Sequence, residues 1–406
     1  MEFREKIVSF FGLRRSIVGI LSVVILVEMG ERMAERFLPI YIMALGGTAI
    51  AIGLLNALNN LLSALYSFPG GYLSDRFGVR RALLIFNSMA IMGFLIVVIF
   101  PYWQAVIVGS FLFIAWSAIS LPATMSLVSK VLPKNKRTMG VSLHSFVRRV
   151  PMALGPVVGG LFIYYWGERR GVRYAFICAI IMTFVAIILQ QNLIEDKPAD
   201  RASDVEKNPF KIMREMSQPL RNLLISDILI RFCEQIPYAF VVVWAMKVIA
   251  HPVTAPQFGL LSAIEMATAM IIYVPVAYFA DKAGKKPFVA MTFVFFTLFP
   301  LTLYFCRSFL PLVFAFILRG LKEFGEPTRK ALIMDLAPEN RKAAMFGLYY
   351  LMRDVIVSIA AFGGAFLWRI SPEVNLFSAC AFGAIGTIWF ILRGKALPAP
   401  SRTHNP

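Results

Sequence analysis

Two hydrophobic segments of the chain carry the same kinds of ionisable side chain at the same spacing. Each has an acid, a base and an acid, and the second set lies 199 residues after the first: Glu28, Arg32 and Glu35, then Asp227, Arg231 and Glu234. Steps of four and three residues place each set on one face of an α-helix, because successive residues turn by about 100°. A carboxylate beside a guanidinium can exchange a proton or hold a charged ligand. We call each set a charge stripe and expect it to bind ions.

The elements that position these stripes are hydrophobic helices. Of the 406 residues, 58% are hydrophobic and only 16% are charged, which is not typical of a soluble domain. Apolar stretches of about 20 residues, long enough to cross a bilayer, follow one another along the chain. The predicted spans are 16–44, 50–73, 79–101, 103–129, 140–164, 172–191, 219–247, 255–280, 286–306, 308–334, 343–368 and 374–393. We therefore predict an all-α membrane protein with twelve transmembrane helices, in which a charge at bilayer depth costs at least about 2.5–3.5 kcal/mol.

The net charge of +18 raises the question of nucleic-acid binding, and the placement of the basic residues answers it. If the N-terminus is cytoplasmic, 27 Lys and Arg residues fall in inside positions and only six in outside loops. This is the positive-inside pattern of membrane proteins, and it predicts that both termini are cytoplasmic. We expect the bilayer of a bacterial inner membrane as the surroundings of the chain and no nucleic acid as a partner.

The chain divides into two similar halves. We expect a first six-helix bundle over 1–191, a cytoplasmic linker over 192–218, a second bundle over 219–393 and a cytoplasmic tail over 394–406. Besides the stripes, matching residues recur at offsets of 205 or 206, among them Asp75 with Asp281, Arg148 with Arg353 and Gly159 with Gly364. Each half begins and ends on the same side, so the halves are parallel repeats. Transporters built in this way bind near the bilayer midplane, where the halves meet.

The loop after the second predicted span has a pattern that suits a latch on the cytoplasmic side. Its residues are Gly71, Asp75, Arg76, Gly78 and Arg81, and the second half has Asp281 and Gly284 in the equivalent place. The glycines permit a tight turn, while the Asp can accept hydrogen bonds from Arg side chains or from a helix N-terminus. A loop with only a structural role is the alternative. With twelve spans in two halves, this loop resembles the signature of the major facilitator superfamily, which implies two six-helix bundles around a central cavity and alternating access.

Two further motifs resemble branches of that superfamily. The fifth predicted span contains Gly155, Pro156, Gly159 and Gly160, similar to a motif of drug/proton antiporters, although Pro151 stands where that motif has Gly. Close helix packing alone is the other explanation. Glu28, Glu31 and Arg32 are similar to the E-x-x-E-R signature of proton-coupled oligopeptide transporters, but Met33 follows where an aromatic residue is expected.

Our working hypothesis is a secondary transporter, not an enzyme, that uses a proton gradient to export a small organic molecule, either a drug-like compound or an organic anion such as a siderophore. Further ionisable residues lie within predicted spans, and ion pairs that fix helix contacts are the alternative explanation for any one of them. The candidate residues of the cavity are Glu28, Glu31, Arg32, Glu35, Arg36, Arg148, Asp227, Arg231, Glu234, Glu265, Glu323, Glu326 and Arg353. The acids are candidate proton sites, and the arginines, which stay charged, are suited to holding an anionic group.

Uptake of a nutrient such as an organic acid or peptide is the second hypothesis, and a membrane receptor or channel is the third. The predicted partners are a small-molecule substrate, protons and the lipid bilayer, and we expect a monomer. We expect no cofactor and no metal, because the four cysteines and three histidines are scattered without metal-like spacing.

Overall fold

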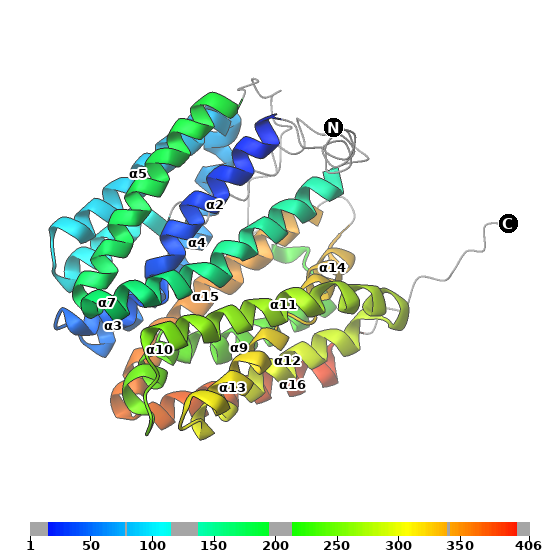
Figure 1. The fold of residues 1–406 in the computed structure, drawn as a ribbon. Coiled ribbons are helices and arrows are strands. Elements are labelled where there is room, and N and C mark those ends of the chain that lie inside the picture. Colours follow the sequence, from blue (N-terminus) through cyan, green and yellow to red (C-terminus); the bar gives the residue numbers. More distant parts are fainter. Residues whose placement is uncertain (1–14, 78, 115–136, 195–212, 339–341, 396–406) are drawn as a thin grey trace, which may run out of the picture. The chain divides into compact units, whose positions relative to one another are not determined.

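A computed structural model describes residues 15–77, 79–114, 137–194, 213–338 and 342–395 of the chain. This part is built of helices and contains no strand. The chain divides into two compact units. Unit 1 comprises Met1–Ser203 with Thr254–Ala263, and unit 2 comprises Asp204–Val253 with Ile264–Pro406. Figure 1 labels the helices along the chain.

Unit 1 is organised around one long helix, α7. Its helices are α2 (Arg15–Glu35), α3 (Leu38–Ala44), α4 (Ala49–Phe77), α5 (Val79–Ile99), the short helix Trp103–Ile114 and α7 (Arg137–Leu193). Gly167 interrupts α7 with φ 75° and ψ 169°, so α7 consists of two helices that match the predicted spans 140–164 and 172–191. Helices α2 and α5 pack against α7, and Val27, Phe86 and Ala186 share a buried core there.

Unit 2 is organised around α9, which packs against α12, α14, α15 and α16. Its elements are α9 (Gln218–Tyr238), α10 (Val241–Val243), the π-helical turn η2 (Trp244–Val248), α11 (Ala255–Ala283) from residue 264 onward, α12 (Lys285–Phe305), α13 (Phe309–Leu321), α14 (Glu326–Leu336), α15 (Lys342–Ile370) and α16 (Pro372–Arg393). The apolar core of the unit includes Leu220, Phe293, Tyr349 and Phe390. The charge stripe on α9 therefore lies at the centre of this unit.

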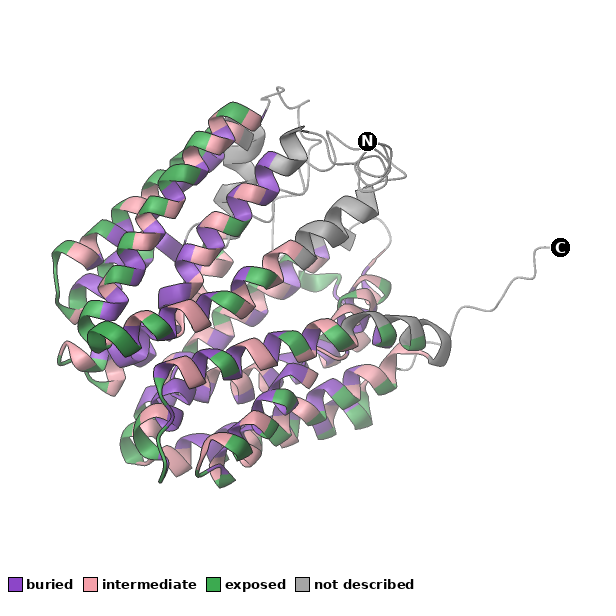
Figure 2. Cartoon of the chain, viewed as in Figure 1, coloured by how far each residue is buried: buried purple, intermediate pink, exposed green. Residues whose placement is uncertain are grey.

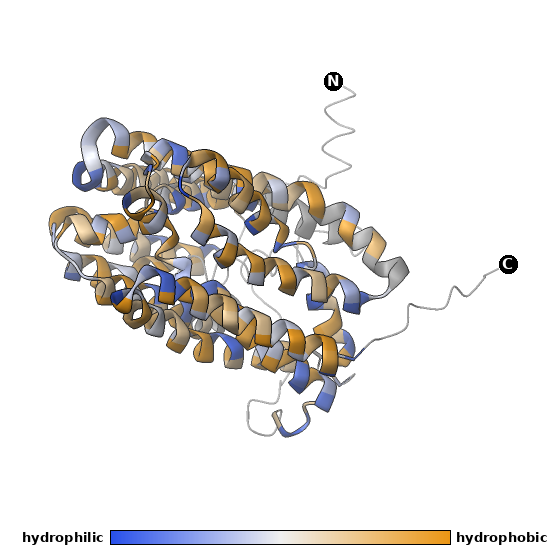
Figure 3. Ribbon diagram, turned by 90° about the horizontal axis from the view of Figure 1, so that it is seen from below, coloured by the Kyte–Doolittle hydropathy of each residue, from blue (hydrophilic) through white to orange (hydrophobic). Residues whose placement is uncertain are grey.

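The helices have the length and composition of membrane spans. Seven helices of the described part meet both criteria, or eight if α9 is joined with the bent segment that follows it. Hydrophobic residues run along the helices while hydrophilic ones gather mainly near their ends (Figure 3). Exposed and buried positions alternate along most helices, and many exposed side chains are large and apolar, as expected where lipid is the solvent (Figure 2). The all-α membrane fold is thus confirmed, whereas the number of twelve spans stays a prediction.

Three predicted spans are broken near their charged residues. In the first, α2 ends at Glu35 and α3 begins at Leu38, while in the seventh, α9 and the segment Val241–Val248 meet at a bend of 42°. In the tenth, α13 ends at Leu321 and α14 begins at Glu326. A proline lies in the first turn of α3 and of α14 and in the last turn of α9, and proline has no N–H to continue a helix.

The glycines of the predicted packing motif allow two helices of unit 1 to approach closely. A Cβ at position 155 would meet the Cβ of Arg32, and one at position 159 would overlap the backbone of Met33, both on α2. A Cβ at position 160 would meet the carbonyl oxygen of Ala255. Each glycine of the motif thus faces another backbone or its first side-chain carbon, as helix packing through small residues requires.

Candidate functional site

The charge stripe of unit 1 lies on α2 and is paired both along the helix and across to α7. Glu28 is fully buried, and its Oε1 accepts a hydrogen bond of 2.5 Å from Nε of Arg148. Its Oε2 is buried without a hydrogen-bond partner in the described part of the chain. Arg32 forms an ion pair with Glu35, three residues further along. Unit 1 therefore holds a buried carboxylate whose second oxygen has no hydrogen-bond partner among the described residues.

Two other predicted residues of unit 1 belong to the same stretch of the chain. Glu31 is buried on α2, and Arg36 is half-buried at the break between α2 and α3. Both take part in polar interactions. The sequence thus gathers five ionisable residues within about three helical turns.

The first acid of the unit 2 stripe is surrounded by donors from two other helices. Asp227 is fully buried on α9, and its Oδ1 forms an ion pair with Arg329 of α14. Its Oδ2 accepts a hydrogen bond of 3.1 Å from the hydroxyl of Tyr349 and one of 3.4 Å from Arg353, both on α15. Arg353 also donates to Asp354 at 2.7 Å. Both carboxylate oxygens of Asp227 therefore have partners, two of which are cationic.

The remaining members of the unit 2 stripe connect α9 to the break between α13 and α14. Arg231 donates to Glu234 at 2.5 Å, and its Nη2 lies 3.7 Å from Oε2 of Glu326. Glu234 also accepts a hydrogen bond of 2.8 Å from Nζ of Lys322. Lys322 follows the last residue of α13 and Glu326 is the first of α14, so the break places a base and an acid on either side of the α9 stripe.

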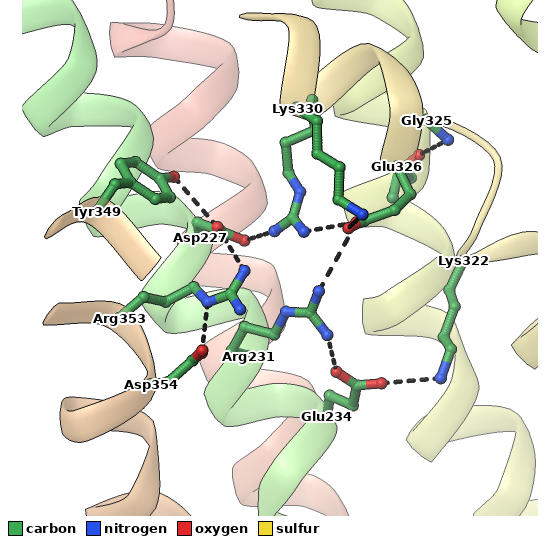
Figure 4. A network of polar contacts seen from close by, with 12 residues as sticks. Asp227, Arg231, Glu234, Lys322, Gly325, Glu326, Lys330, Tyr349, Arg353 and Asp354 are labelled. Carbon is green, nitrogen blue, oxygen red and sulfur yellow. Dashed lines mark hydrogen bonds and ion pairs between the residues drawn. The ribbon is translucent and has the colours of Figure 1, made fainter. Parts of the chain in front are cut away.

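The break itself is supported by a neighbouring helix. The N–H of Gly325 donates a hydrogen bond of 2.6 Å to Oγ1 of Thr292 on α12. Figure 4 shows Gly325 at the upper right of the network. A backbone donor that leaves the helical pattern inside a membrane needs such a replacement partner. The predicted site residue Glu323 lies half-buried in this break and takes part in polar interactions of its own.

Glu265 extends the charged region onto α11. It is buried, and its Oε1 lies 3.3 Å from Nε of Arg319 and 3.4 Å from Nζ of Lys322. The guanidinium of Arg319 lies 5.0 to 5.6 Å from the ring centres of three aromatic residues, which are Tyr238, Phe299 and Phe316. Aromatic faces attract a cation and lower the cost of burying it.

These pairs join into one continuous network of alternating sign within unit 2. In order, its members are Arg319, Glu265, Lys322, Glu234, Arg231, Glu326, Arg329, Asp227, Arg353 and Asp354. Figure 4 shows the central part of this network, with Arg231 between Glu234 and Glu326. The ion-pair network crosses five helices, α9, α11, α13, α14 and α15. Replacing buried ion pairs by apolar residues is often neutral or stabilising, so packing alone does not require so dense a set of charges.

The two units repeat the same two pairings. Within each unit, the first acid of the stripe pairs with an arginine, Glu28 with Arg148 in unit 1 and Asp227 with Arg353 in unit 2, and these two arginines are 205 residues apart in the sequence. The base of each stripe then pairs with the acid three residues further on. The repeat that the sequence predicts is therefore visible in the contacts of side chains as well as in the order of the residues.

Sequence reasoning did not place four members of the network among its site residues. They are Arg319, Lys322, Arg329 and Asp354, and Tyr349, which donates a hydrogen bond to Asp227, was not assigned either. A helical-face argument finds two of them, because Arg329 follows Glu326 by three residues and Tyr349 precedes Arg353 by four. The position of Lys322 depends on the break between α13 and α14, which hydrophobicity does not reveal.

The predicted cytoplasmic latch falls mostly outside the described residues. Gly78 is not described, and of Gly71, Asp75, Arg76 and Asp281 only the helical backbone is. Arg81 is exposed at the start of α5. Gly284 has φ 88° at the start of α12, a conformation that favours glycine and agrees with a tight turn there. The latch itself stays a prediction.

Comparison of the sequence and the fold with known proteins identifies the family of this chain. The sequence matches the Major Facilitator Superfamily over residues 20–252 and 223–406. A transporter of the same type from Methanocaldococcus jannaschii is 21% identical over 360 residues, which cover 86% of this chain and 87% of the relative. A homologue of the multi-drug resistance efflux pump PmrA from Lactococcus lactis is 22% identical over 87% of this chain and 88% of the relative. The staphylopine export protein of Staphylococcus aureus is 22% identical over 46% of each chain.

Solved structures share the fold at low sequence identity. A nucleoside transporter matches with a TM-score of 0.81 and 11% identity, covering 93% of this chain and all of the other. A peptide transporter crystallised with sulfate matches with a TM-score of 0.77 and 14% identity, covering 95% and 94%. The sequence match spans nearly the whole chain and the fold agrees with it, so this protein is an integral membrane protein and a transporter of the Major Facilitator Superfamily.

Proposed function

We propose that this transporter is driven by a proton gradient and exports a small organic molecule. The observation that supports the proposal best is the ion-pair network of unit 2, together with the two pairings that it shares with unit 1. Ionisable residues within membrane spans are costly, and they are typical of proton relays and of substrate pathways. A network in which nearly every charge has two partners can exchange partners without leaving a buried charge alone.

The acids and bases of the site suit two different tasks. Glu28 is a buried carboxylate with one oxygen that has no hydrogen-bond partner in the described ranges, and such a group can bind a proton when its arginine moves away. Arginine keeps its charge in a protein, so Arg148 and Arg231 are suited to controlling the acids or to holding an anionic group. Proton uptake by an acid and release of its base would thus be coupled events.

Relatives support the direction of export. Two of them are named for export or efflux, the staphylopine export protein and the homologue of a multi-drug resistance efflux pump. The Gly155 to Gly160 motif on α7, which resembles that of drug/proton antiporters, points the same way. We propose the same direction for this chain.

Proton-coupled uptake of a nutrient is the second candidate, and one motif favours it. Glu28, Glu31 and Arg32 match the spacing of the oligopeptide-transporter signature. In this chain Arg32 pairs with Glu35, outside the matched motif, and Glu28 pairs with Arg148. The measurement of direction described next separates the two candidates.

Transport into reconstituted vesicles tests the proposal. The purified protein is placed in vesicles with an imposed pH gradient, and both the internal pH and the uptake of labelled compounds are followed. Export coupled to protons predicts that a substrate accumulates on the side from which protons leave, and that the substrate in turn drives proton movement. Uptake by symport predicts that the substrate and the proton move in the same direction.

Glu35→Gln and Glu234→Gln serve as the matched pair of variants. Each removes one acid of a stripe while keeping its shape, and we expect both to abolish accumulation without preventing insertion into the membrane. Arg214→Gln, an exposed residue that precedes α9, is the control and is expected to transport normally. Undiminished accumulation in both acid variants would contradict the assignment, and a lack of proton movement across a broad panel of compounds would contradict proton coupling.

A further inference from the structure

One carboxylate of the ion-pair network is held by three cations. Glu326 is the first residue of α14. Its carboxylate oxygens lie 2.5 Å from a nitrogen of Arg329 and 3.4 Å from Nζ of Lys330, which belong to the same helix, and 3.7 Å from Nη2 of Arg231, which belongs to α9. Arg231 and Arg329 both approach Oε2, while Lys330 approaches Oε1. Figure 4 shows the labelled side chains of Arg231 and Lys330 converging on that of Glu326. We call Arg231, Arg329 and Lys330 the cation nest.

Two members of the cation nest, Arg231 and Lys330, lie at a partly exposed edge of the network. The Glu326 side chain is 14% exposed, that of Arg231 is 20% exposed and that of Lys330 is 49% exposed, whereas Arg329 and Asp227 deeper in unit 2 are buried. Two of the three contacts to Glu326 are longer than an ordinary charge-assisted hydrogen bond. Glu326 thus makes a short contact with Arg329 and longer contacts with the more exposed Arg231 and Lys330.

Spare hydrogen-bonding capacity exists on the same cations. The Nε atoms of Arg231 and Arg329 are buried and have no hydrogen-bond partner in the described part of the chain. Glu326 therefore satisfies only part of what two guanidinium groups can donate, since each carries five N–H donors. A ligand with planar, paired oxygens matches the fork of a guanidinium better than a single shared oxygen does.

We propose that Glu326 is an internal substitute for a carboxylate of the substrate, and that a carboxylate-bearing substrate binds by displacing it from the cation nest. The carboxylate of Glu326 and that of the substrate have the same charge and the same planar shape. Binding therefore exchanges one carboxylate for another and leaves no buried arginine without a counter-charge. The empty transporter needs the same neutralisation when it returns without substrate, and Glu326 supplies it.

The inference narrows the proposed function to substrates that carry a carboxylate, and it rests on that function for its role in transport. Its test does not need a gradient. Equilibrium binding of labelled succinate is measured on the purified full-length protein in detergent, for wild type and for Glu326→Gln, which keeps the size of the side chain but removes its charge. We expect the variant to bind succinate at least tenfold more tightly, because the internal competitor is gone.

Three controls make this result specific. Asp335→Asn removes a carboxylate from the same helix, where it pairs with Lys285 away from the nest, and is expected to change succinate binding less than twofold. Arg231→Gln combined with Glu326→Gln is expected to abolish the gain. Succinamide, which has the same shape without charge, is expected to bind all variants equally weakly.

Several results would overturn the proposal. Succinate binding by Glu326→Gln no tighter than by wild type contradicts displacement, and an equal gain in Asp335→Asn shows a general effect of charge. A larger gain for inorganic phosphate than for succinate contradicts the carboxylate class. If Glu326→Gln does not fold, Glu326→Asp keeps the charge but retracts it from Arg231, and we expect severalfold tighter succinate binding; no gain there is equally contradictory. Proton-driven transport of a cation without any carboxylate binding would leave the proposed function standing and refute this inference alone.

Discussion

The first acids of the two charge stripes, Glu28 in unit 1 and Asp227 in unit 2, occupy equivalent places but have unequal surroundings. Both are fully buried and both pair with an equivalent arginine. Asp227 has two further partners, Arg329 and Tyr349, whereas one oxygen of Glu28 has no hydrogen-bond partner in the described part. The duplicated acid therefore has more partners in unit 2 than it has among the described residues of unit 1.

The additional partners of the unit 2 stripe come mainly from the tenth predicted span. Lys322, Glu326 and Arg329 surround the unit 2 stripe, and at the equivalent places 205 residues earlier the sequence has Ser117, Leu121 and Thr124. The second half has gained a set of charges that the first half lacks. The cationic partners that the tenth predicted span gives to the unit 2 stripe thus have no charged counterparts at these positions of the first half of the sequence.

The largest expected effect is on stability. Asp227→Asn should lower the free energy of unfolding by about 3 kcal/mol, near the low end for a broken buried pair, because Arg329 and Arg353 keep Glu326 and Asp354 as second partners. Glu28→Gln should cost about 1 kcal/mol, because its partner Arg148 is partly exposed. Unfolding in mixed detergent micelles measures both. Equal losses would contradict the difference in surroundings between the two acids.

Next in size is the effect of a methyl group at two equivalent glycines. A Cβ at Gly159 would overlap the backbone of Met33, and one at Gly364 would overlap that of Ile236, so Gly159→Ala and Gly364→Ala should each cost about 2 kcal/mol. Gly363→Ala, with open space around its Cβ, is the matched control and should be neutral or slightly stabilising. Unfolding measurements on the three variants would show whether the two units share this close helix packing although their charged residues differ.

We expect Glu28, the acid with fewer partners, to contribute to proton coupling. Glu28→Gln should reduce proton-driven accumulation at least about tenfold, which corresponds to about 1.4 kcal/mol. Exchange of labelled for unlabelled substrate in the absence of a pH gradient should continue, because the substitution keeps the size of the side chain. Vesicle transport with and without the gradient separates the two quantities. Normal coupling in this variant would move the coupling site away from the first acid of unit 1.

The smallest expected effect concerns the break that brings charge to unit 2. Thr292→Val removes the acceptor of the Gly325 N–H and should cost about 1 kcal/mol, the usual price of one unsatisfied backbone donor. The equivalent residue 206 positions earlier is Phe86, which offers no such acceptor. Thr302→Val is the control, since its hydroxyl bonds only within its own helix. Indistinguishable stabilities of the two variants would show that Thr292 does not support the break.

The sequence predicts the helices well because hydrophobicity over about 20 residues is a strong and local signal. The range predicted for α12, 286–306, differs from the observed Lys285–Phe305 by one residue at each end. The pairing of Arg231 with Glu234 follows from the helical period alone. Contacts between helices are another matter. That Glu326 meets Arg231, and that Lys322 bridges Glu234 and Glu265, depends on how α9, α11 and α14 pack, and no periodicity within one helix contains that information.

The double linkage of the ion-pair network has a consequence for how this protein changes over generations. Glu234, Glu265 and Asp227 each have two cationic partners, and Glu326 has three. A mutation that removes one base therefore leaves each of these four acids with at least one cationic partner. Residues at the partly exposed edge, such as Arg231 and Lys330, can then be substituted one at a time. Redundant pairing therefore allows ligand selectivity to change through single mutations that keep the buried acids paired.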